Sequence, residues 1–519
     1  MNRIVFLLLI SGFFMTSCTA ANRGAHEKAE NADHRILSQI ENIVVIMLEN
    51  RSFDNLAGWL YDKNTPPKKF IMPVDSAPDH YDGLAYGSFS NPNIEGKEPA
   101  SIPIKFGTDN YTVPSPDPHE EFQYVTEQLY GNMTPTYGDK APMNGFVRNY
   151  ASVPDSNPAH IMQTYTPEQL PVLSAIARNF AISDRWFASV PTQTLANRAF
   201  LHSGTSEGNV NNSDNYVFHS KTIFNVLSDY DVSWKVYSDS GFLPSLTRIK
   251  MSKLWSPRYH NHFFGFENFI ADAKAGSLPS YSFIEPKFIG DTKITSSNPN
   301  SEHPPTNISA GDQFLAKIYN AVFNGPDRNK TILIVTYDEH GGIYDHVSPP
   351  WGAKSPDNNS NPGKRGFHFD RFGVRIPTII VSPWIEEGTV FRSFSTPYDH
   401  TSIIATIMDW QGIPRNELPS KRVAAADNIA NIFTLSEPRK LPVITLPDIG
   451  EEILPADNSI RGLTGLERGV IGAYMKYIHA QADCKISHSE IDEKLDKIKH
   501  HGKIQDYIDE LQSKGCCCK

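Results

Sequence analysis

Between residues 19 and 483 the sequence has no cysteine, and the whole chain of 519 residues has five. A disulfide framework and a thiolate metal site are therefore excluded from that stretch. No apolar run of spanning length follows the N-terminal segment, so no transmembrane helix is expected in the mature protein. Positive charge is also scarce: 48 Lys and Arg against 58 Asp and Glu give a net charge of −10, which argues against nucleic-acid binding.

The N-terminus has the pattern of an export signal. Arg3 precedes a mostly apolar run over 4–15, and small residues follow at 17–20. This run is shorter than the ~20 residues of a membrane-spanning helix, which predicts a signal peptide over 1–17, with a buried N-terminal helix as the alternative. The context of Cys18 resembles a lipoprotein processing site, so acylation and simple cleavage both stay open. We expect an exported protein that is secreted, periplasmic or lipid-anchored in a bacterial envelope.

Three continuous apolar runs rich in β-branched residues predict strands buried on both faces. These runs occupy 43–48, 331–337 and 377–382. Helical patterns occur at 166–180, 313–323 and 401–410. Buried strands that alternate with helices predict an α/β fold with a mainly parallel sheet between helices.

Changes in composition along the chain predict its division into parts. A polar tether over 18–40 is expected to precede a single catalytic domain over 41–450. Amphipathic patterns at 467–481 and 489–511 then predict a C-terminal helical appendage over 451–519, without catalytic chemistry of its own.

Acidic and amide residues follow two of the predicted strands. Glu49 and Asn50 end the first strand, and Asp338 and Glu339 end the strand at 331–337. Ligands bind outside the carboxyl ends of parallel strands, and adjacent carboxylates after a buried run are costly to desolvate unless a cation compensates them. A polar helix cap and an exposed acidic loop are the alternatives. The pattern favours a divalent metal site built from oxygen ligands.

A hydroxyl residue at a helix start can use backbone N–H groups to hold a phosphate. Thr192 and Thr194 both qualify, either as a nucleophile activated by a metal ion or as a simple helix cap. Asn197 and Arg198 can contact phosphoryl oxygens. Histidines at 119, 303, 346 and 400 occur near the same strand ends, although a single histidine is more often structural.

These motifs, in this order, resemble the bacterial phosphoesterase family of phospholipases C and a branch of acid phosphatases. The match spans about residues 40 to 415. Its blocks are 49–54, 117–120, 191–194 with 197–198, 203–205, 281–286, 302–305, 337–347 and 398–402. The resemblance implies an alkaline-phosphatase-like α/β fold.

The resemblance also implies roles for individual residues. A divalent ion, zinc by expectation, would be bound by Glu49, Asn50, Asp338 and Glu339. The family nucleophile falls on Thr194, and the catalytic histidines would be His119, His303 and His346. The expected substrate-binding residues are Asn197, Arg198 and Asp345. Ala196 departs from the family, because many members have proline there.

Blocks at 143–147, 166–173 and 186–191 resemble the phosphatidylcholine-cleaving branch. Nearby aromatic residues could hold a choline group by cation–π contact, although such residues more often fill the core; they are Trp186, Phe187, Tyr281, Phe283 and Tyr344. We therefore expect an exported, metal-dependent phospholipase C that releases diacylglycerol and a phosphorylated head group from phospholipid at a membrane surface. The alternatives are an acid phosphatase that acts on monoesters and an envelope binding protein that retains the fold without catalysis.

Overall fold

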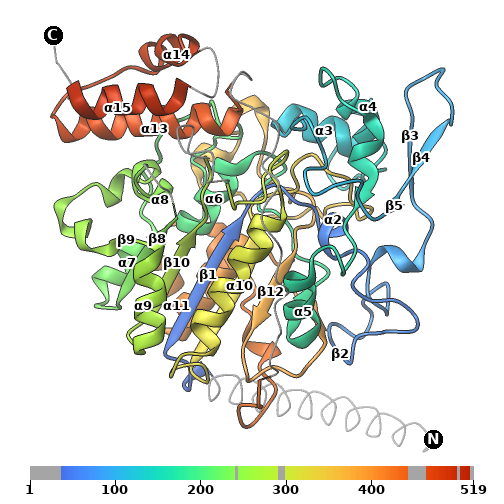
Figure 1. The fold of residues 1–519 in the computed structure, drawn as a ribbon, viewed down its shortest axis with the longest axis horizontal. Helices are drawn as coiled ribbons and strands as arrows, with labels where there is room; N and C mark the ends of the chain where they lie inside the picture. The colour runs from blue at the N-terminus through green and yellow to red at the C-terminus, as the bar shows by residue number, and fades with distance from the viewer. Residues whose placement is uncertain (1–36, 240–242, 290–298, 442–462, 499–502, 515–519) are drawn as a thin grey trace, which may run out of the picture.

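The computed structural model describes residues 37–239, 243–289, 299–441, 463–498 and 503–514. The predicted signal peptide and nearly all of the predicted tether lie outside these ranges. A nine-stranded sheet forms the centre of the described chain (Figure 1), in the order β2-β13-β7-β12-β11-β1-β10-β8-β9. In that order the strands are Lys69–Ile71, Thr389–Phe391, Ala181–Ser183, Thr378–Val381, Thr331–Tyr337, Asn42–Leu48, Tyr281–Glu285, Trp234–Ser238 and Phe263–Gly265.

Within this sheet, β12 alone runs opposite to the other strands. It pairs antiparallel with β11 and with β7, whereas the remaining neighbours pair in parallel. The predicted α/β class with a mainly parallel sheet is confirmed, and the three strands expected from apolar runs are β1, β11 and β12. An apolar run carries no direction, so the reversal of β12 could not be predicted from it.

Helices cover both faces of the sheet (Figure 1). On one face α10 contacts α5 and α9, and on the other α6 contacts α7 and α11. The helices α2 to α8 are Phe53–Ala57, Phe122–Tyr130, Phe146–Tyr150, Pro171–Asn179, Thr194–Ser203, Ile223–Asp229 and Leu246–Lys250. The helices α9 to α12 are Phe266–Ala275, Ser309–Phe323, His400–Trp410 and Lys421–Ala425. The helices expected at 166–180, 313–323 and 401–410 are thus confirmed as α5, α10 and α11.

Two two-stranded sheets belong to the loops outside the main sheet. One is formed by β3 (Ser90–Pro92) and β4 (Ser101–Pro103), and the other by β5 (Lys105–Phe106) and β6 (Gln163–Thr164).

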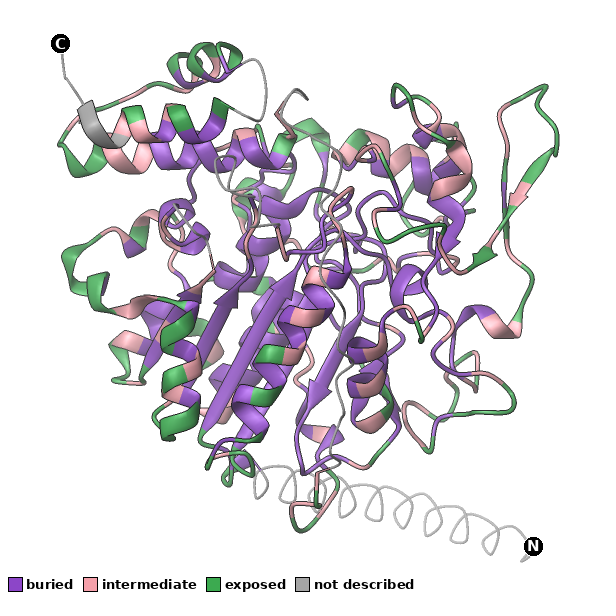
Figure 2. Ribbon diagram, in the orientation of Figure 1, coloured by how far each residue is buried: buried purple, intermediate pink, exposed green. Residues whose placement is uncertain are grey.

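The central strands β1 and β11 are buried along their whole length, as the purple core of Figure 2 shows. Because β1, β11, β10 and β7 run in one direction, the loops after them meet at one edge of the sheet. This catalytic edge receives the residues that follow each strand.

The C-terminal region contains α13 (Gly465–Gln481), α14 (His488–Asp496) and α15 (Ile504–Lys514). The helix expected at 467–481 is α13, but the single helix expected at 489–511 is wrong, because two helices occupy that stretch. Apolar residues of all three helices are buried in the main core, including Ile471, Leu495 and Ile508. None of the helices described is long and apolar enough to span a membrane.

Candidate active site

The four residues predicted to bind a metal ion come together at the catalytic edge. β1 and β11 pair in parallel along their full length, so Glu49 and Asn50 lie beside Asp338 and Glu339. The backbone N–H groups of Asn50 and Glu339 both donate to Oδ1 of Asp338, at 2.9 and 2.7 Å. All four side chains are fully buried.

Backbone geometry explains how Asn50 reaches this position. Asn50 has φ of 57°, and Gly341 has φ of 64°. A Cβ on Gly341 would lie 2.2 Å from the carbonyl oxygen of Asn50, which leaves no space for any other residue. The adjacent glycines after Glu339 therefore allow the loop after β11 to close on the loop after β1.

The protein satisfies the oxygens of these carboxylates only in part. Both oxygens of Glu49, Oδ2 of Asp338 and Oε1 of Glu339 are buried without a hydrogen-bond partner in the part of the chain that is described. Burial raises the pKa of Glu49 to about 7 although Arg198 opposes the shift. Burial, together with the charge of Asp338, raises the pKa of Glu339 well above its usual range. Three carboxylates stand beside one cation, Arg198, and their oxygen donors and excess negative charge fit a divalent cation.

A second group of ligand-type side chains adjoins the first. Ligand atoms of Asp117, Glu120 and His303 all lie within 4.8 Å of one another. The amide of Asn50 donates to Oε1 of Glu120, which joins the two groups. Burial alone would lower the pKa of His303, but the carboxylates of Asp117 and Glu49 raise it above its ordinary value.

Asp117 and Glu120 were missed as site residues. They belong to the motif at 117–120, of which the sequence predicts only the histidine as a site residue. The imidazole of His119 stacks on Tyr124, with ring centroids 4.1 Å apart. In the described ranges, no hydrogen bond or ion pair joins this imidazole to Thr194 or to the buried carboxylates.

Thr194 is the first residue of α6, and its hydroxyl lies 3.3 Å from Oδ1 of Asn50. It is fully buried. The hydroxyl of Thr192 instead donates to the carbonyl of Val210, so it holds the local turn. The geometry places Thr194, rather than Thr192, next to the candidate metal ligands and at a helix N-terminus that favours phosphate.

Asn197 and Arg198, which are predicted to bind substrate, both form hydrogen bonds within the protein. The amide of Asn197 donates to three backbone carbonyls of residues 190–193 and accepts from the N–H of Val190. Arg198 donates to the carbonyls of Met47 and Leu48. Its guanidinium also lies 3.8 Å from Glu49 and 3.5 Å from Asp338. These contacts favour positioning roles for both residues.

Asp345 and His346 belong to a separate buried ion-pair cluster. Arg375 donates to Asp345 and to Asp54, at 3.0 and 2.8 Å, and His346 contacts Asp54 at 2.7 Å and Asp82 at 3.1 Å. Burial raises the pKa of Asp345 to about 6. Burial would lower the pKa of His346, but Asp54 and Asp82 raise it to about 9. The acidic and basic groups of this cluster pair with one another. These ion pairs connect the loops after β1 and β11, next to the candidate metal ligands.

The proposed aromatic cage is wrong. The five aromatic residues are buried in the protein interior. Trp186 stacks on Tyr398, and Tyr281 and Phe283 pack around Phe224. These rings fill the core and cannot receive a choline group.

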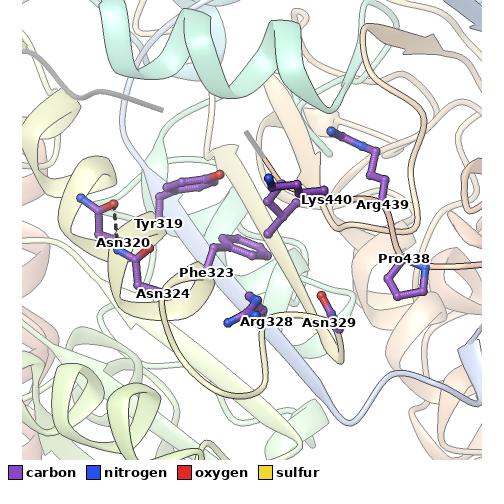
Figure 3. Close-up of a pocket in the computed structure, with 10 residues that line it drawn as sticks. Tyr319, Asn320, Phe323, Asn324, Arg328, Asn329, Pro438, Arg439 and Lys440 are labelled. Carbon is purple, nitrogen blue, oxygen red and sulfur yellow. Dashed lines mark hydrogen bonds between the residues drawn. The ribbon is translucent and has the colours of Figure 1, made fainter. Parts of the chain in front are cut away.

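A hollow of about 600 Å³ lies elsewhere, between the end of α10 and residues 438–441 (Figure 3). Its lining includes Phe323, Asn329 and Arg439. Asn329 lies just before the start of β11, so this hollow is at the amino-terminal edge of the sheet. None of the predicted site residues lines it.

Sequence comparison places this site in a known family. A sequence model of the Phosphoesterase family matches residues 40–414. The Arabidopsis thaliana protein named Non-specific phospholipase C1 is 36% identical over 438 residues, which cover 81% of this chain and 76% of that protein. The Mycobacterium tuberculosis protein named Phospholipase C A is 27% identical over 457 residues, which cover 81% of each.

Solved structures show only a distant likeness. A protein in the alkaline phosphatase superfamily from Vibrio parahaemolyticus aligns with 50% of this chain and 63% of its own, at 11% identity and a TM-score of 0.29. A score this low supports no inference, so the fold class rests on the strand order and layers described above. The family match does carry weight: the chain belongs to the Phosphoesterase family and is a phosphoric ester hydrolase.

Proposed function

We propose that the protein is an exported, metal-dependent phospholipase C that uses Thr194 as its nucleophile. One observation carries the proposal: buried carboxylates with unsatisfied oxygens surround Asn50, whose amide oxygen faces the hydroxyl of Thr194. The names of the relatives support phospholipid as the substrate. Zinc is the proposed metal, held by Glu49, Asn50, Asp338 and Glu339.

A divalent cation bound at these four residues would lower the pKa of an adjoining hydroxyl and offset developing charge on phosphoryl oxygens. Asn50 orients the hydroxyl of Thr194, whose oxygen attacks phosphorus as its proton passes to water. The bond from phosphorus to the diacylglycerol oxygen breaks, and that oxygen takes up a proton. His303 is the proposed donor, because the carboxylates of Asp117 and Glu49 favour the protonated form of its imidazole and raise its pKa above the ordinary value against the effect of burial. Water then releases the phosphorylated head group from Thr194.

Purified enzyme should release diacylglycerol and phosphocholine from phosphatidylcholine micelles, because the proposed leaving group is diacylglycerol. The products can be measured by chromatography beside a parallel assay with a small phosphomonoester. The ratio of the two kcat/KM values distinguishes the candidate activities. Rapid monoester hydrolysis with no diacylglycerol would assign the protein to the acid-phosphatase activity instead. No turnover of either substrate in metal-loaded protein would favour a binding protein.

Export is proposed from the N-terminal pattern, which lies outside the described residues. If Cys18 is acylated, the mature protein should fractionate with membranes and begin with a lipid-modified cysteine, as mass spectrometry can show. A mature N-terminus at another residue on soluble protein would indicate ordinary secretion. Full-length protein that keeps residues 1–17 in the cytoplasm would contradict export.

A further inference from the structure

The turn that carries Thr194 is held on both sides by one asparagine. Oδ1 of Asn212 accepts from the backbone N–H of Leu195 at 2.9 Å. The N–H of Asn212 donates to Oε1 of Gln193 at 3.0 Å. Because Gln193 and Leu195 flank Thr194, these two bonds set where the Thr194 hydroxyl lies relative to Asn50.

The C-terminal helix α13 has glycines at 465, 469 and 472. Residues at this spacing share one side of a helix. Glycine is among the least favourable residues in a helix, so three on one side indicate a face that allows close approach of another segment. We call Gly465 and Gly469 the glycine face; Gly472 lies further along the same side of α13.

The glycine face lies directly on the residues that hold Thr194. A Cβ on Gly469 would lie 2.5 Å from Cδ1 of Leu195 and 3.7 Å from Cβ of Asn212. A Cβ on Gly465 would lie 3.1 Å from Nε2 of Gln193. All three residues around the nucleophile turn therefore contact this one helix.

Helix α13 is itself fixed to the catalytic core (Figure 1). It contacts α8 and α6, and Val470, Ile471 and Met475 are buried in the main core. The hydroxyl of Tyr216 donates to Asp492 of α14 at 2.6 Å, which adds a polar link. The family match ends at residue 414, so this support for the nucleophile turn comes from outside the matched region.

We propose that α13 is a positioning element of the active site, whose glycine face holds Gln193, Leu195 and Asn212 so that the Thr194 hydroxyl stays on Asn50. The proposal rests on Thr194 being the nucleophile. A methyl group added at Gly469 would push on the side chain of Leu195, next to Thr194, without touching a metal ligand. Misplacing a reacting group by about 1 Å can cost about 10²-fold in rate, so the change should lower kcat rather than substrate binding.

The test compares two variants of the full chain, Gly469→Ala and Gly472→Ala. A Cβ on Gly472 would lie 2.5 Å from ring carbons of Tyr216, an equally close approach away from the nucleophile turn. Gly469→Ala should lower kcat on phosphatidylcholine by at least ~10-fold, with KM and bound metal within ~2-fold of wild type. Gly472→Ala should keep kcat within ~2-fold, whatever its effect on Tm.

A second substitution tests whether the effect of Gly469→Ala is transmitted through Leu195. Leu195→Ala removes the atom that the new Cβ would meet, so the double variant Gly469→Ala/Leu195→Ala should have a higher kcat than Gly469→Ala alone. If Gly469→Ala does not fold, Gly465→Val replaces it with the same readouts. Wild-type kcat in Gly469→Ala, or in Gly465→Val where that variant replaces it, overturns the proposal. A loss of kcat that follows the loss of Tm in both Gly469→Ala and Gly472→Ala overturns it as well. Wild-type activity in Thr194→Ala would instead refute the nucleophile assignment on which it rests.

Discussion

Thr194→Ala is expected to lower kcat/KM on phosphatidylcholine by at least ~10³-fold, because it removes the oxygen proposed to attack phosphorus. The hydroxyl makes a 3.3 Å contact with Asn50 and is not itself among the four proposed metal ligands. Bound metal and Tm should therefore remain close to those of wild type. Diacylglycerol release, metal content and thermal unfolding are the three measurements.

Two variants serve as controls for this result. Thr194→Ser offers the same oxygen and should retain turnover. Thr192→Ala loses a hydrogen bond to the carbonyl of Val210 and should affect stability more than chemistry. Near-wild-type activity in Thr194→Ala combined with an inactive Thr192→Ala would move the nucleophile by two residues.

Removal of the metal is expected to lower turnover by about 10³-fold, because several kcal/mol of charge stabilisation would be lost and each 1.36 kcal/mol is a factor of ten. Added Zn²⁺ should restore activity after chelation. Asp338→Asn should lower both metal content and kcat, since it removes a charged ligand from the buried group at the ends of β1 and β11. Elemental analysis and diacylglycerol release give the two readouts.

Glu437→Gln is a matched control for charge loss, because Glu437 is exposed and lies outside the site. It should change neither metal content nor kcat. Full activity in protein shown by elemental analysis to be free of metal would refute the metal dependence. An Asp338→Asn variant that keeps wild-type metal content would remove Asp338 from the ligand set.

The central strands, and the proximity of Glu49 and Asn50 to Asp338 and Glu339, could be predicted from the sequence for one physical reason. Long apolar runs such as 331–337 must be buried, and parallel strands deliver the residues after them to the same edge. Glu49 and Asp338 were therefore recognisable from their places in the chain. The position of Thr194 at a helix start followed from the same kind of argument, although the choice between Thr192 and Thr194 needed the resemblance.

The remaining features depend on contacts that no local pattern records. Asp117 and Glu120 lie in an irregular loop, where neither strand nor helix periodicity indicates the direction of a side chain. The side-chain amide of Asn197 donates hydrogen bonds to backbone carbonyls of the turn at 190–193. Residue propensities do not specify the backbone conformation on which these bonds depend. The positive φ values of Gly341 and Gly342 change the direction of the chain after β11. His346 lies beyond this turn and forms an ion pair with Asp54.

Mass spectrometry of enzyme quenched with acid during turnover of phosphatidylcholine tests the central claim most directly. If Thr194 attacks phosphorus and diacylglycerol leaves, the peptide that contains Thr194 should carry a covalently bound phosphocholine group. The modification should be absent from Thr194→Ala and from enzyme without metal. Phosphocholine on another residue, or rapid turnover without any enzyme-bound phosphocholine, would contradict the account.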